Sequence, residues 1–564
     1  MKFQDMPYSR IDFEKAADEL KKIMEDFREA ADWEEELEVH KRYYALSDHV
    51  KTMRILAQIR HSIDTVDPFY SEEKDYYDQK MPEFSNREVE YRNLLLKSPN
   101  REKLEAVIGR PAFANMELGA RSVSQETVPL MQEENALVTR YEKLLAGAQI
   151  PWEGETLNLS MMTPYLTSPD REVRIQAAEK VNEFYESIQG ELDEIFDLLV
   201  KNRTLQAKKL GFENFTSLGY CRMMRSSYGR EEVESFREQI KRYWVPFAEE
   251  IWENRRKRLG LNKLYHLDEG VSFQEGSPKP VGSPQEILKD GQRMYDALSP
   301  ETSEFFRFMM EHELLDVFSR KNKQVGGYME YLPEFGAPFI FANFNGTSGD
   351  VDVITHECGH AFQGYLVGKE DPVREHWDIT METAETHSMS MEFFTNPWMD
   401  WFFGVRGKDF LLSQFEDAAV FIPYGCMVDE FQHIVYDQPQ LTPEQRKAAW
   451  KKLEREYKPH LIYGEASRFY ENGGFWQRQH HIYSLPFYYI DYAIAQTNAF
   501  QYRIWMEKDR QGAWESYLKF CRLSASDFFG NMLTEAGLES PFEEGRIREL
   551  TQKLAEIYER LRSE

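Results

Sequence analysis

The sequence predicts a mainly α-helical protein with a small β-sheet next to a helix that carries the pattern H-E-x-x-H. Three observations predict this fold class. Apolar residues in the N-terminal part of the chain recur at spacings of three and four, the period of an amphipathic helix. Residues 338–344 break that period with a short aromatic run between turn residues, as a strand does. The H-E-x-x-H pattern follows at residues 356–360, in a segment with one apolar side.

Residues 1–165 are expected to form a lobe of helices. Ser9 and Asp12 are spaced as in a capping box, and the apolar residues that follow have helical spacing: Phe13, Ala16, Leu20, Ile23, Met24 and Phe27. The same pattern continues over residues 32–65. The acidic faces of these helices are most simply solvated surface, and we find no catalytic constellation in this lobe.

Two further helix starts are predicted beyond this lobe. Ser168–Asp170 offers a serine cap, a proline at the first helical position and an acidic residue near the positive end of the helix dipole. Ser283–Glu286 repeats the cap and the proline and adds a capping-box glutamate. Residues 270–284 lie between them and are rich in Gly, Ser and Pro, which predicts either a linker or a surface loop.

The strand predicted at residues 338–344 has two interpretations. An exposed strand edge next to a hydrolytic site could bind an extended peptide through backbone hydrogen bonds. Alternatively, it is an ordinary strand of a small sheet. Edge exposure cannot be deduced from sequence, so both interpretations stay open.

The pattern H-E-x-x-H is the strongest functional signal in the chain. On a helix, residues four apart lie on the same face, so His356 and His360 would direct their imidazoles to one point. Zinc accepts nitrogen ligands in a tetrahedral array, and catalytic sites leave one position to water. Glu357 would flank that water as a general base. The pattern therefore predicts a catalytic zinc site.

A third protein ligand must come from another segment. If residues 378–395 form a helix, Glu382, Glu385 and Glu392 share one face, and spacing alone does not choose among them. Cys358 lies inside the motif but points about 100° round the helix from each adjacent position, away from the two histidines.

The motif residues resemble the M3 family of zinc oligopeptidases, and more closely its oligoendopeptidase F and Pz-peptidase branch. The resemblance rests on the segment His356–His360, on residues 385–388 (Glu-Thr-His-Ser), and on similar segments at 168–174 and 473–493. It implies that Glu385 is the third zinc ligand. It also implies helical lobes that enclose a deep substrate channel. We place an N-terminal helical lobe at residues 1–165 and the catalytic region at residues 166–564.

A second cluster, at residues 473–493, contains His and Tyr side chains that suit transition-state stabilisation. Amide hydrolysis develops an oxyanion, and hydrogen-bond donors must stabilise it. The resemblance implies that His and Tyr from this region bind substrate, and we assign those roles to His481, Tyr489 and Tyr492. His480 competes with His481, and Tyr488 competes with the two tyrosines.

Composition narrows the class of partner. The formal net charge of −28 argues against a nucleic-acid-binding surface. The four cysteines are scattered, which favours reduced thiols in the cytoplasm. The N-terminal residues lack the apolar core of a signal peptide, and no stretch approaches the length of a membrane helix. We therefore expect a cytoplasmic protein that acts without membrane or nucleic acid.

The sequence predicts a zinc-dependent metalloendopeptidase that hydrolyses internal bonds of short unfolded peptides, with one Zn²⁺ per chain. Asp352 or Glu392 is expected to accept the second N–H of a ligand histidine and fix its tautomer. Two alternatives remain: a zinc-containing peptide-binding protein without turnover, and a zinc hydrolase of a non-peptide amide. The presence of Glu357 next to the first histidine favours turnover, because a receptor needs no general base.

Overall fold

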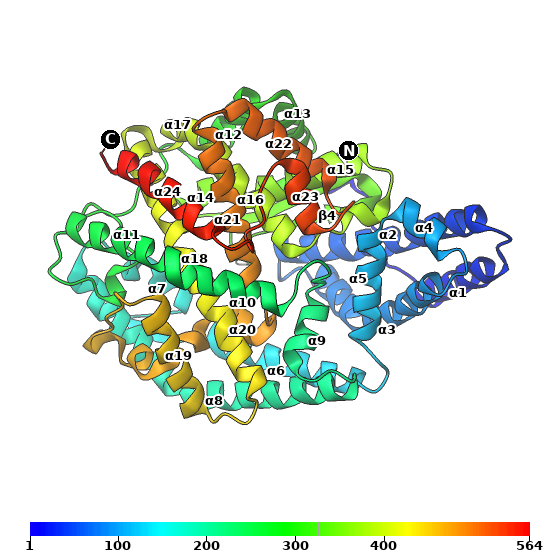
Figure 1. Cartoon of the computed structure of the whole chain (residues 1–564), viewed down its shortest axis with the longest axis horizontal. Helices are drawn as coiled ribbons and strands as arrows, with labels where there is room; N and C mark the ends of the chain where they lie inside the picture. The colour runs from blue at the N-terminus through cyan, green and yellow to red at the C-terminus, as the bar shows by residue number, and fades with distance from the viewer. Residues whose placement is uncertain (325, 564) are drawn as a thin grey trace. The chain divides into compact units, whose positions relative to one another are not determined.

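The computed structural model describes residues 1–324 and 326–563, which fold mainly as helices (Figure 1). They form two compact units, each built from three stretches of chain. The first unit comprises Met1–Ala120, Pro278–Gly407 and Asn498–Glu539, and the second comprises Arg121–Ser277, Lys408–Thr497 and Ser540–Glu564. The division at residues 165/166, which rests on the family resemblance, stays a prediction. No helix among the described residues is long and apolar enough to span a bilayer.

The first unit contains the predicted sheet and the H-E-x-x-H segment. Its strands are β3 (Leu315–Phe318), β4 (Tyr328–Leu332) and β5 (Ala337–Phe344). Its helices are α1 (Phe13–Glu29), α2 (Trp33–Ile63), α3 (Pro68–Leu96), α4 (Arg101–Ile108), α5 (Arg110–Arg121), α12 (Pro284–Leu298), α13 (Pro300–Glu311), α14 (Gly349–Asp352), α15 (Cys358–Glu370), α16 (Met381–Phe394), α17 (Met399–Phe403), α22 (Arg510–Leu523) and α23 (Phe529–Ala536).

The second unit is helical apart from one short hairpin, β1 (Ile150–Trp152) and β2 (Glu155–Leu157). Its helices are α6 (Val128–Ala146), α7 (Leu159–Leu166), α8 (Arg171–Lys209), α9 (Phe215–Arg222), α10 (Arg230–Gln239), α11 (Val245–Arg258), α18 (Gly407–Asp437), α19 (Pro443–Tyr457), α20 (His480–Ser484) and α24 (Arg546–Ser563). Helix α21 (Tyr489–Met506) begins in this unit and ends in the first.

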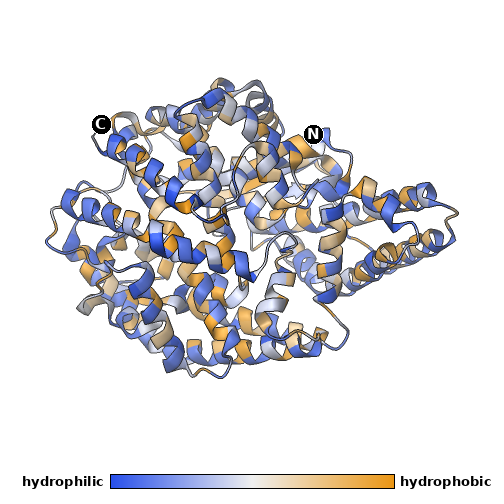
Figure 2. Ribbon diagram, in the orientation of Figure 1, coloured by the Kyte–Doolittle hydropathy of each residue, from blue (hydrophilic) through white to orange (hydrophobic). Residues whose placement is uncertain are grey.

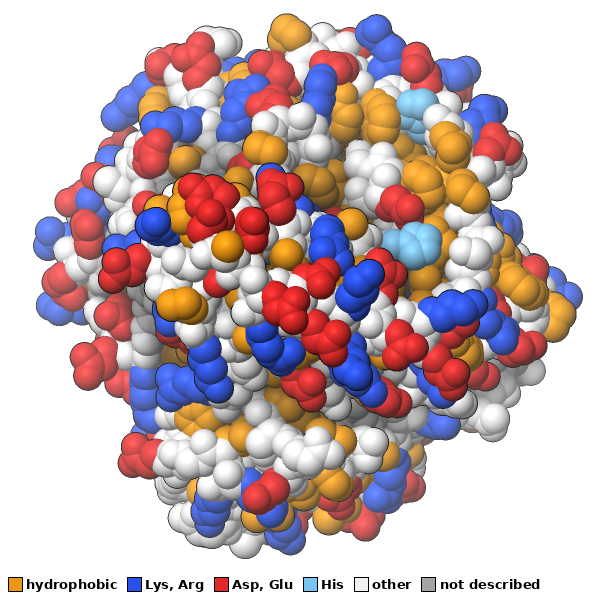
Figure 3. All heavy atoms as spheres, turned by 90° about the vertical axis from the view of Figure 1, so that its right-hand side faces the viewer, with side chains coloured by type: hydrophobic (Ala, Val, Ile, Leu, Met, Phe, Trp, Pro, Cys, Tyr) orange, Lys and Arg blue, Asp and Glu red, His pale blue; other side chains and the backbone are white. Residues whose placement is uncertain are grey.

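The helices bury apolar stripes and expose charged faces, as the predicted periodicity requires. Orange and blue residues alternate round many of the helices (Figure 2). In α1 the buried positions are Ala16, Leu20, Ile23 and Phe27, all from the predicted apolar series. On the face shown in Figure 3, acidic and basic side chains are interspersed, without a single basic patch.

The predicted helices are present, but in two of them the N-cap residue differs from the predicted one. Asp12, not Ser9, caps α1, because its carboxylate accepts from the Lys15 N–H (3.2 Å). Asp170, not Ser168, caps α8. The Ser168 hydroxyl accepts from the Asp170 N–H (3.2 Å) in a local turn, so the chain is still extended at Asp170 and the helix begins one residue later.

The start of α12 matches its prediction. Ser283 caps the helix, Pro284 is its first residue, and the Glu286 carboxylate accepts from the Ser283 N–H (2.7 Å). Residues 270–283 form no helix or strand, and the boundary between the two units falls among them at Ser277/Pro278.

The sheet of the first unit has the strand order β3-β5-β4. Strand β5 pairs in parallel with β3 and antiparallel with β4, with Leu315 opposite Ile340 and Tyr328 opposite Phe341. Its residues are buried almost throughout, as expected of a strand covered on both faces. The strand at 338–344 is therefore confirmed, but the interpretation that it is an exposed edge strand is wrong, because β5 is the central strand of the sheet.

Helix α15 contacts this sheet through glycines. A Cβ atom on Gly368 would lie 1.7 Å from the Tyr331 Oη of β4, and one on Gly364 would lie 3.1 Å from the Tyr331 Cδ2. The two glycines thus leave space for the tyrosine ring between helix and strand. The Tyr331 hydroxyl is buried without a hydrogen-bond partner among the described residues, so the ring contributes through packing.

Substituting Gly368→Ala should destabilise the first unit, although alanine is a better helix former than glycine by about 1 kcal/mol. Steric overlap with Tyr331 should outweigh that gain and cost about 1–3 kcal/mol. Thermal unfolding of Gly368→Ala, Gly364→Ala and the double variant Gly368→Ala/Tyr331→Leu measures the effect. We expect the largest loss in Gly368→Ala and recovery in the double variant. A higher unfolding midpoint for Gly368→Ala would contradict this packing.

Candidate active site

The H-E-x-x-H segment lies across a change of helix type. Residues Val353–Glu357 form a π-helical turn, and the α-helix α15 begins at Cys358. The Tyr295 hydroxyl of α12 donates to the Ile354 carbonyl of this turn (2.7 Å). Such π-turns are uncommon and occur frequently at functional sites.

The two histidines of the motif lie next to each other. The ring centroids of His356 and His360 are 5.1 Å apart at 84°. Both rings and the Glu357 side chain are partly exposed, whereas Thr355 and Cys358 are buried. The segment therefore has the predicted buried side and a side that carries its ionisable groups.

Glu385 of α16 brings a carboxylate to both histidines. Its Oε2 lies 3.4 Å from the His356 Nε2 and 3.5 Å from the His360 Nε2, and the three donor atoms lie within 4.8 Å of one another. Two zinc bonds of about 2.1 Å at the tetrahedral angle separate their donor atoms by about 3.4 Å. The donor set and these separations fit a zinc ion. Among the described residues, no other group of this kind is found.

Gly359 allows α16 to approach the motif this closely. A Cβ atom at this position would lie 2.6 Å from the Ser388 Cα and 3.0 Å from the His387 carbonyl oxygen, both on α16. Real Cβ atoms do not approach backbone atoms so closely, so any larger residue must displace one helix. On the other side, the Tyr517 hydroxyl donates to the His387 carbonyl (3.0 Å) and fixes α16 against α22.

The other candidate carboxylates have different partners. Glu392 accepts a hydrogen bond from the His356 Nδ1 (2.7 Å), which in the neutral ring leaves Nε2 free to bind a metal. Glu382 accepts from the Thr380 hydroxyl (2.9 Å). The Ser388 hydroxyl donates to the Glu385 Oε2 (3.0 Å) and helps to orient that carboxylate.

The electrostatics of this group favour a positive charge among the three side chains. Burial acts to lower the pKa of His356, but the hydrogen bonds to Glu385 and Glu392 outweigh it and raise the pKa well above its usual value. Burial acts to raise the pKa of Glu385, but the charge of His360 and the bonds to both histidines lower it well below its usual value. Without a metal, a proton provides this charge; a bound cation would replace it.

In the second unit, His481 contacts all three candidate tyrosines. Its ring centroid lies 5.1 Å from that of Tyr489, 5.6 Å from that of Tyr488 and 6.1 Å from that of Tyr492. His481, Tyr489 and Tyr492 are half-buried, and Tyr488 is only 6% exposed. The cluster therefore combines a histidine with two partly accessible phenols.

The neighbouring His480 has a different environment. Its Nε2 is 3.0 Å from Glu142 on α6, and its Nδ1 is 2.8 Å from the Ser484 hydroxyl. The ring of His480 thus has partners at both nitrogens and is directed toward α6 rather than toward the tyrosines.

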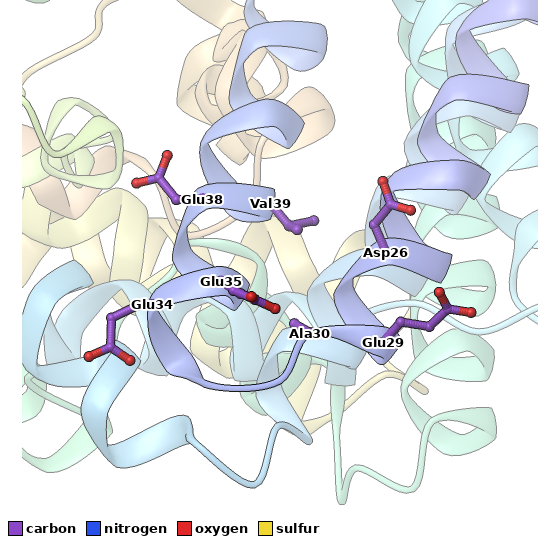
Figure 4. A pocket seen from close by; sticks show the side chains of 7 residues that line it. All are labelled: Asp26, Glu29, Ala30, Glu34, Glu35, Glu38 and Val39. Atoms are coloured by element: carbon purple, nitrogen blue, oxygen red, sulfur yellow. The ribbon is translucent and has the colours of Figure 1, made fainter.

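A separate pocket of about 480 Å³ lies between α1 and α2 in the first unit (Figure 4). Carboxylates from both helices line it: Asp26, Glu29, Glu34, Glu35 and Glu38. It contains none of the candidate site residues.

Comparisons with known proteins agree with this geometry. The model of the peptidase M3 N-terminal domain matches residues 3–123, and that of peptidase family M3 matches residues 293–552. A solved structure of Pz peptidase A with an inhibitor is 42% identical, covers 99% of each chain and has a TM-score of 0.93. The chain belongs to peptidase family M3. The predicted resemblance is therefore confirmed, and this M3 chain is a metalloendopeptidase with a metal site.

Other relatives of this M3 peptidase extend the likeness. A Bacillus anthracis protein assigned provisionally to oligoendopeptidase F is 40% identical, with a TM-score of 0.89 over 99% of this chain and 98% of that one. An oligoendopeptidase F homolog of Borreliella burgdorferi is 20% identical over 527 residues, which are 88% of this chain and 86% of the relative.

Two residues that contact the candidate site residues were not identified from the sequence. Gly359 lies inside the motif, and its small size between the two histidines was the only sign that another helix passes there. Gln479 precedes the histidine pair without any pattern of its own, although its amide contacts His481 (2.9 Å). Glu392 was one of two residues expected to bond a motif histidine. The sequence could not choose it, because its bond to His356 depends on how α16 packs against the motif.

Replacing Glu392 by Gln should weaken zinc binding, because the bond to the His356 Nδ1 loses its charged acceptor. Loss of the hydrogen-bond partner of a ligand histidine costs about 10–100-fold in metal affinity. Competition with a chromophoric chelator at fixed pH measures the dissociation constant. Glu370→Gln, at the exposed end of α15, is the matched control and should bind zinc as the wild type does. Equal affinities for Glu392→Gln and wild type would contradict this role.

Proposed function

We propose that this M3 peptidase is a zinc-dependent endopeptidase that hydrolyses internal peptide bonds of short oligopeptides, with one zinc ion per chain. The observation that carries the proposal is the convergence of His356, His360 and Glu385: the Glu385 Oε2 lies 3.4 and 3.5 Å from the two Nε2 atoms, as two ligands of one tetrahedral ion do, and all three donor atoms lie within 4.8 Å of one another. We assign these three side chains as the zinc ligands. When bound, zinc supplies Lewis-acid chemistry that makes water a stronger nucleophile and polarises a carbonyl.

Glu357 is proposed as the general base and acid. It directly follows the first ligand, and its side chain is partly exposed on the same segment. In this role its carboxylate takes a proton from the attacking water and then returns it to the leaving amine nitrogen. Peptide-bond cleavage thereby proceeds without a free amide anion.

His481, Tyr489 and Tyr492 are proposed to donate hydrogen bonds to the oxyanion. Burial raises the pKa of Tyr489 to about 12, against the opposing charge of Arg478, so this phenol keeps its proton at neutral pH. A protonated phenol can donate to developing negative charge, as oxyanion stabilisation requires.

The proposed substrates are short unfolded peptides. The relatives named Pz peptidase A and oligoendopeptidase F homolog support a peptide substrate. A net charge of −28 disfavours nucleic acid as a partner. We also propose a cytoplasmic location, on the sequence argument from scattered cysteines.

One alternative is a peptide receptor that binds zinc without turnover. It predicts that peptide binds and is never cleaved, and it gives Glu357 no role. A zinc hydrolase of a non-peptide amide would leave peptides intact altogether.

Glu357→Gln should lose peptidase activity by about 10²–10⁴-fold, the contribution of general acid–base catalysis, because the amide cannot accept the proton. Cleavage of an internally quenched peptide, with zinc measured on the same samples, tests this. Zinc content should not change, and Glu370→Gln should be as active as the wild type. If the wild type bound zinc and peptide but never cleaved the peptide, the protein would be a receptor rather than an enzyme.

His481→Ala should lower kcat by about 10²–10³-fold, the usual cost of removing one oxyanion donor, with a smaller effect on KM. His480→Ala is the matched control from the adjacent position, and we expect it to retain activity because His480 pairs with Glu142. Steady-state kinetics on the same quenched peptide separates the two. If both variants lost kcat equally, His480 and His481 would affect activity only through the folding of this segment.

A further inference from the structure

The side chain of Gln479 lies between a tyrosine and the proposed catalytic histidine. Its Oε1 accepts a hydrogen bond from the Tyr424 hydroxyl of α18 (2.7 Å), and its Nε2 is 2.9 Å from the His481 Nδ1. Gln479 is the N-cap residue of α20, and its backbone N–H donates to the Trp476 carbonyl (2.9 Å). All four residues belong to the second unit, so this chain of bonds is local.

The chemistry of the amide decides the protonation of the imidazole. An amide nitrogen only donates hydrogen bonds, so the His481 Nδ1 must be the acceptor. The neutral ring then carries its proton on Nε2. In the structure the carbonyl oxygen of the amide faces the Tyr424 hydroxyl, and its NH₂ group faces the His481 ring.

We propose that Gln479 fixes His481 as the neutral tautomer protonated on Nε2, so that His481 donates a hydrogen bond without becoming an imidazolium. This inference rests on the proposed role of His481 in oxyanion stabilisation. Gln479 is a positioning residue, because it acts through His481.

The groups around His481 agree with a neutral ring. From α21 it faces the phenols of Tyr488, Tyr489 and Tyr492, at centroid distances of 5.6, 5.1 and 6.1 Å. Two neighbours come from the preceding residues: Gln479, which is neutral, and His480, whose ring centroid lies 6.0 Å from that of His481. Glu142 of α6 is hydrogen-bonded to His480, and Tyr424 of α18 is hydrogen-bonded to Gln479. The carboxylate of Glu142 pairs with His480 (3.0 Å), and the positive charge of Arg478 acts on Tyr489, whose ring lies against that of His481.

The substitution Gln479→Glu tests the tautomer through pH. A carboxylate at this position accepts a proton from Nδ1, so the neutral ring loses its Nε2 proton and donates from Nε2 only as the imidazolium. The carboxylate also raises the pKa of His481, so the imidazolium is present below that pKa and lost above it. Activity in the variant should therefore require protonation, which the wild type does not.

We expect the ratio of kcat/KM between Gln479→Glu and the wild type to stay within a few-fold at low pH. Above the pKa of His481 it should fall about tenfold per pH unit, as a single titration requires. Gln479→Met, of similar size, removes the donor without adding a charge and should show a pH-independent ratio. If kcat/KM of Gln479→Glu had the same pH dependence as that of the wild type, the proposal would be overturned. Gln479 would then serve only to hold the structure, and the tautomer of His481 would not matter for activity.

A second measurement does not depend on catalysis. In protein labelled with ¹⁵N-histidine, the His481 signals are identified by their absence in His481→Ala, and their shifts report which ring nitrogen carries the proton. We expect protonated Nε2 in the wild type and protonated Nδ1 in Gln479→Glu. A wild type with protonated Nδ1 refutes the inference, whereas full activity in His481→Ala refutes only the proposed role of the histidine.

Discussion

The metal centre depends on the close approach of two helices in the first unit. At Gly359 the backbone of α16 comes so near to α15 that a Cβ atom would lie 2.6 Å from the Ser388 Cα. Only this approach lets Glu385 reach both histidines at 3.4 and 3.5 Å. Because zinc bonds tolerate deviations of only about 0.2 Å, a displaced α16 would remove Glu385, the proposed third ligand. The glycine between the two motif histidines is therefore as necessary to the proposed site as the ligands are.

Hydrogen bonds then orient the side chains that packing brings together. Glu392 fixes the His356 ring through Nδ1, and Ser388 donates to the Glu385 carboxylate. In the second unit, Gln479 does for His481 what Glu392 does for His356, but with a neutral donor in place of an anionic acceptor. The two partners impose opposite roles on Nδ1: it donates in His356 and accepts in His481. Each arrangement suits the role proposed for its ring, because Nε2 must carry a lone pair to bind a metal and a proton to stabilise an oxyanion.

Local signals allowed much of the fold to be predicted, and long-range packing accounts for the rest. Helical periodicity and the strand at 338–344 are properties of short segments, so they are visible in sequence. The cap at Asp170 depends on a turn made by Ser168, which propensities alone do not resolve. Whether β5 lies at an edge depends on strands that pair with it from both sides. Spacing alone left Glu382, Glu385 and Glu392 equivalent, and the family resemblance chose Glu385.

The most direct test of the metal centre is anomalous diffraction at the zinc edge from crystals of the zinc-loaded protein. The account predicts one peak per chain, about 2.1 Å from the Nε2 atoms of His356 and His360 and from the Oε2 of Glu385. In crystals of Gly359→Val, the same peak should weaken or vanish, because the larger side chain displaces α16. A strong peak elsewhere, or an undisturbed peak in Gly359→Val, would contradict the dependence of the site on this helix approach.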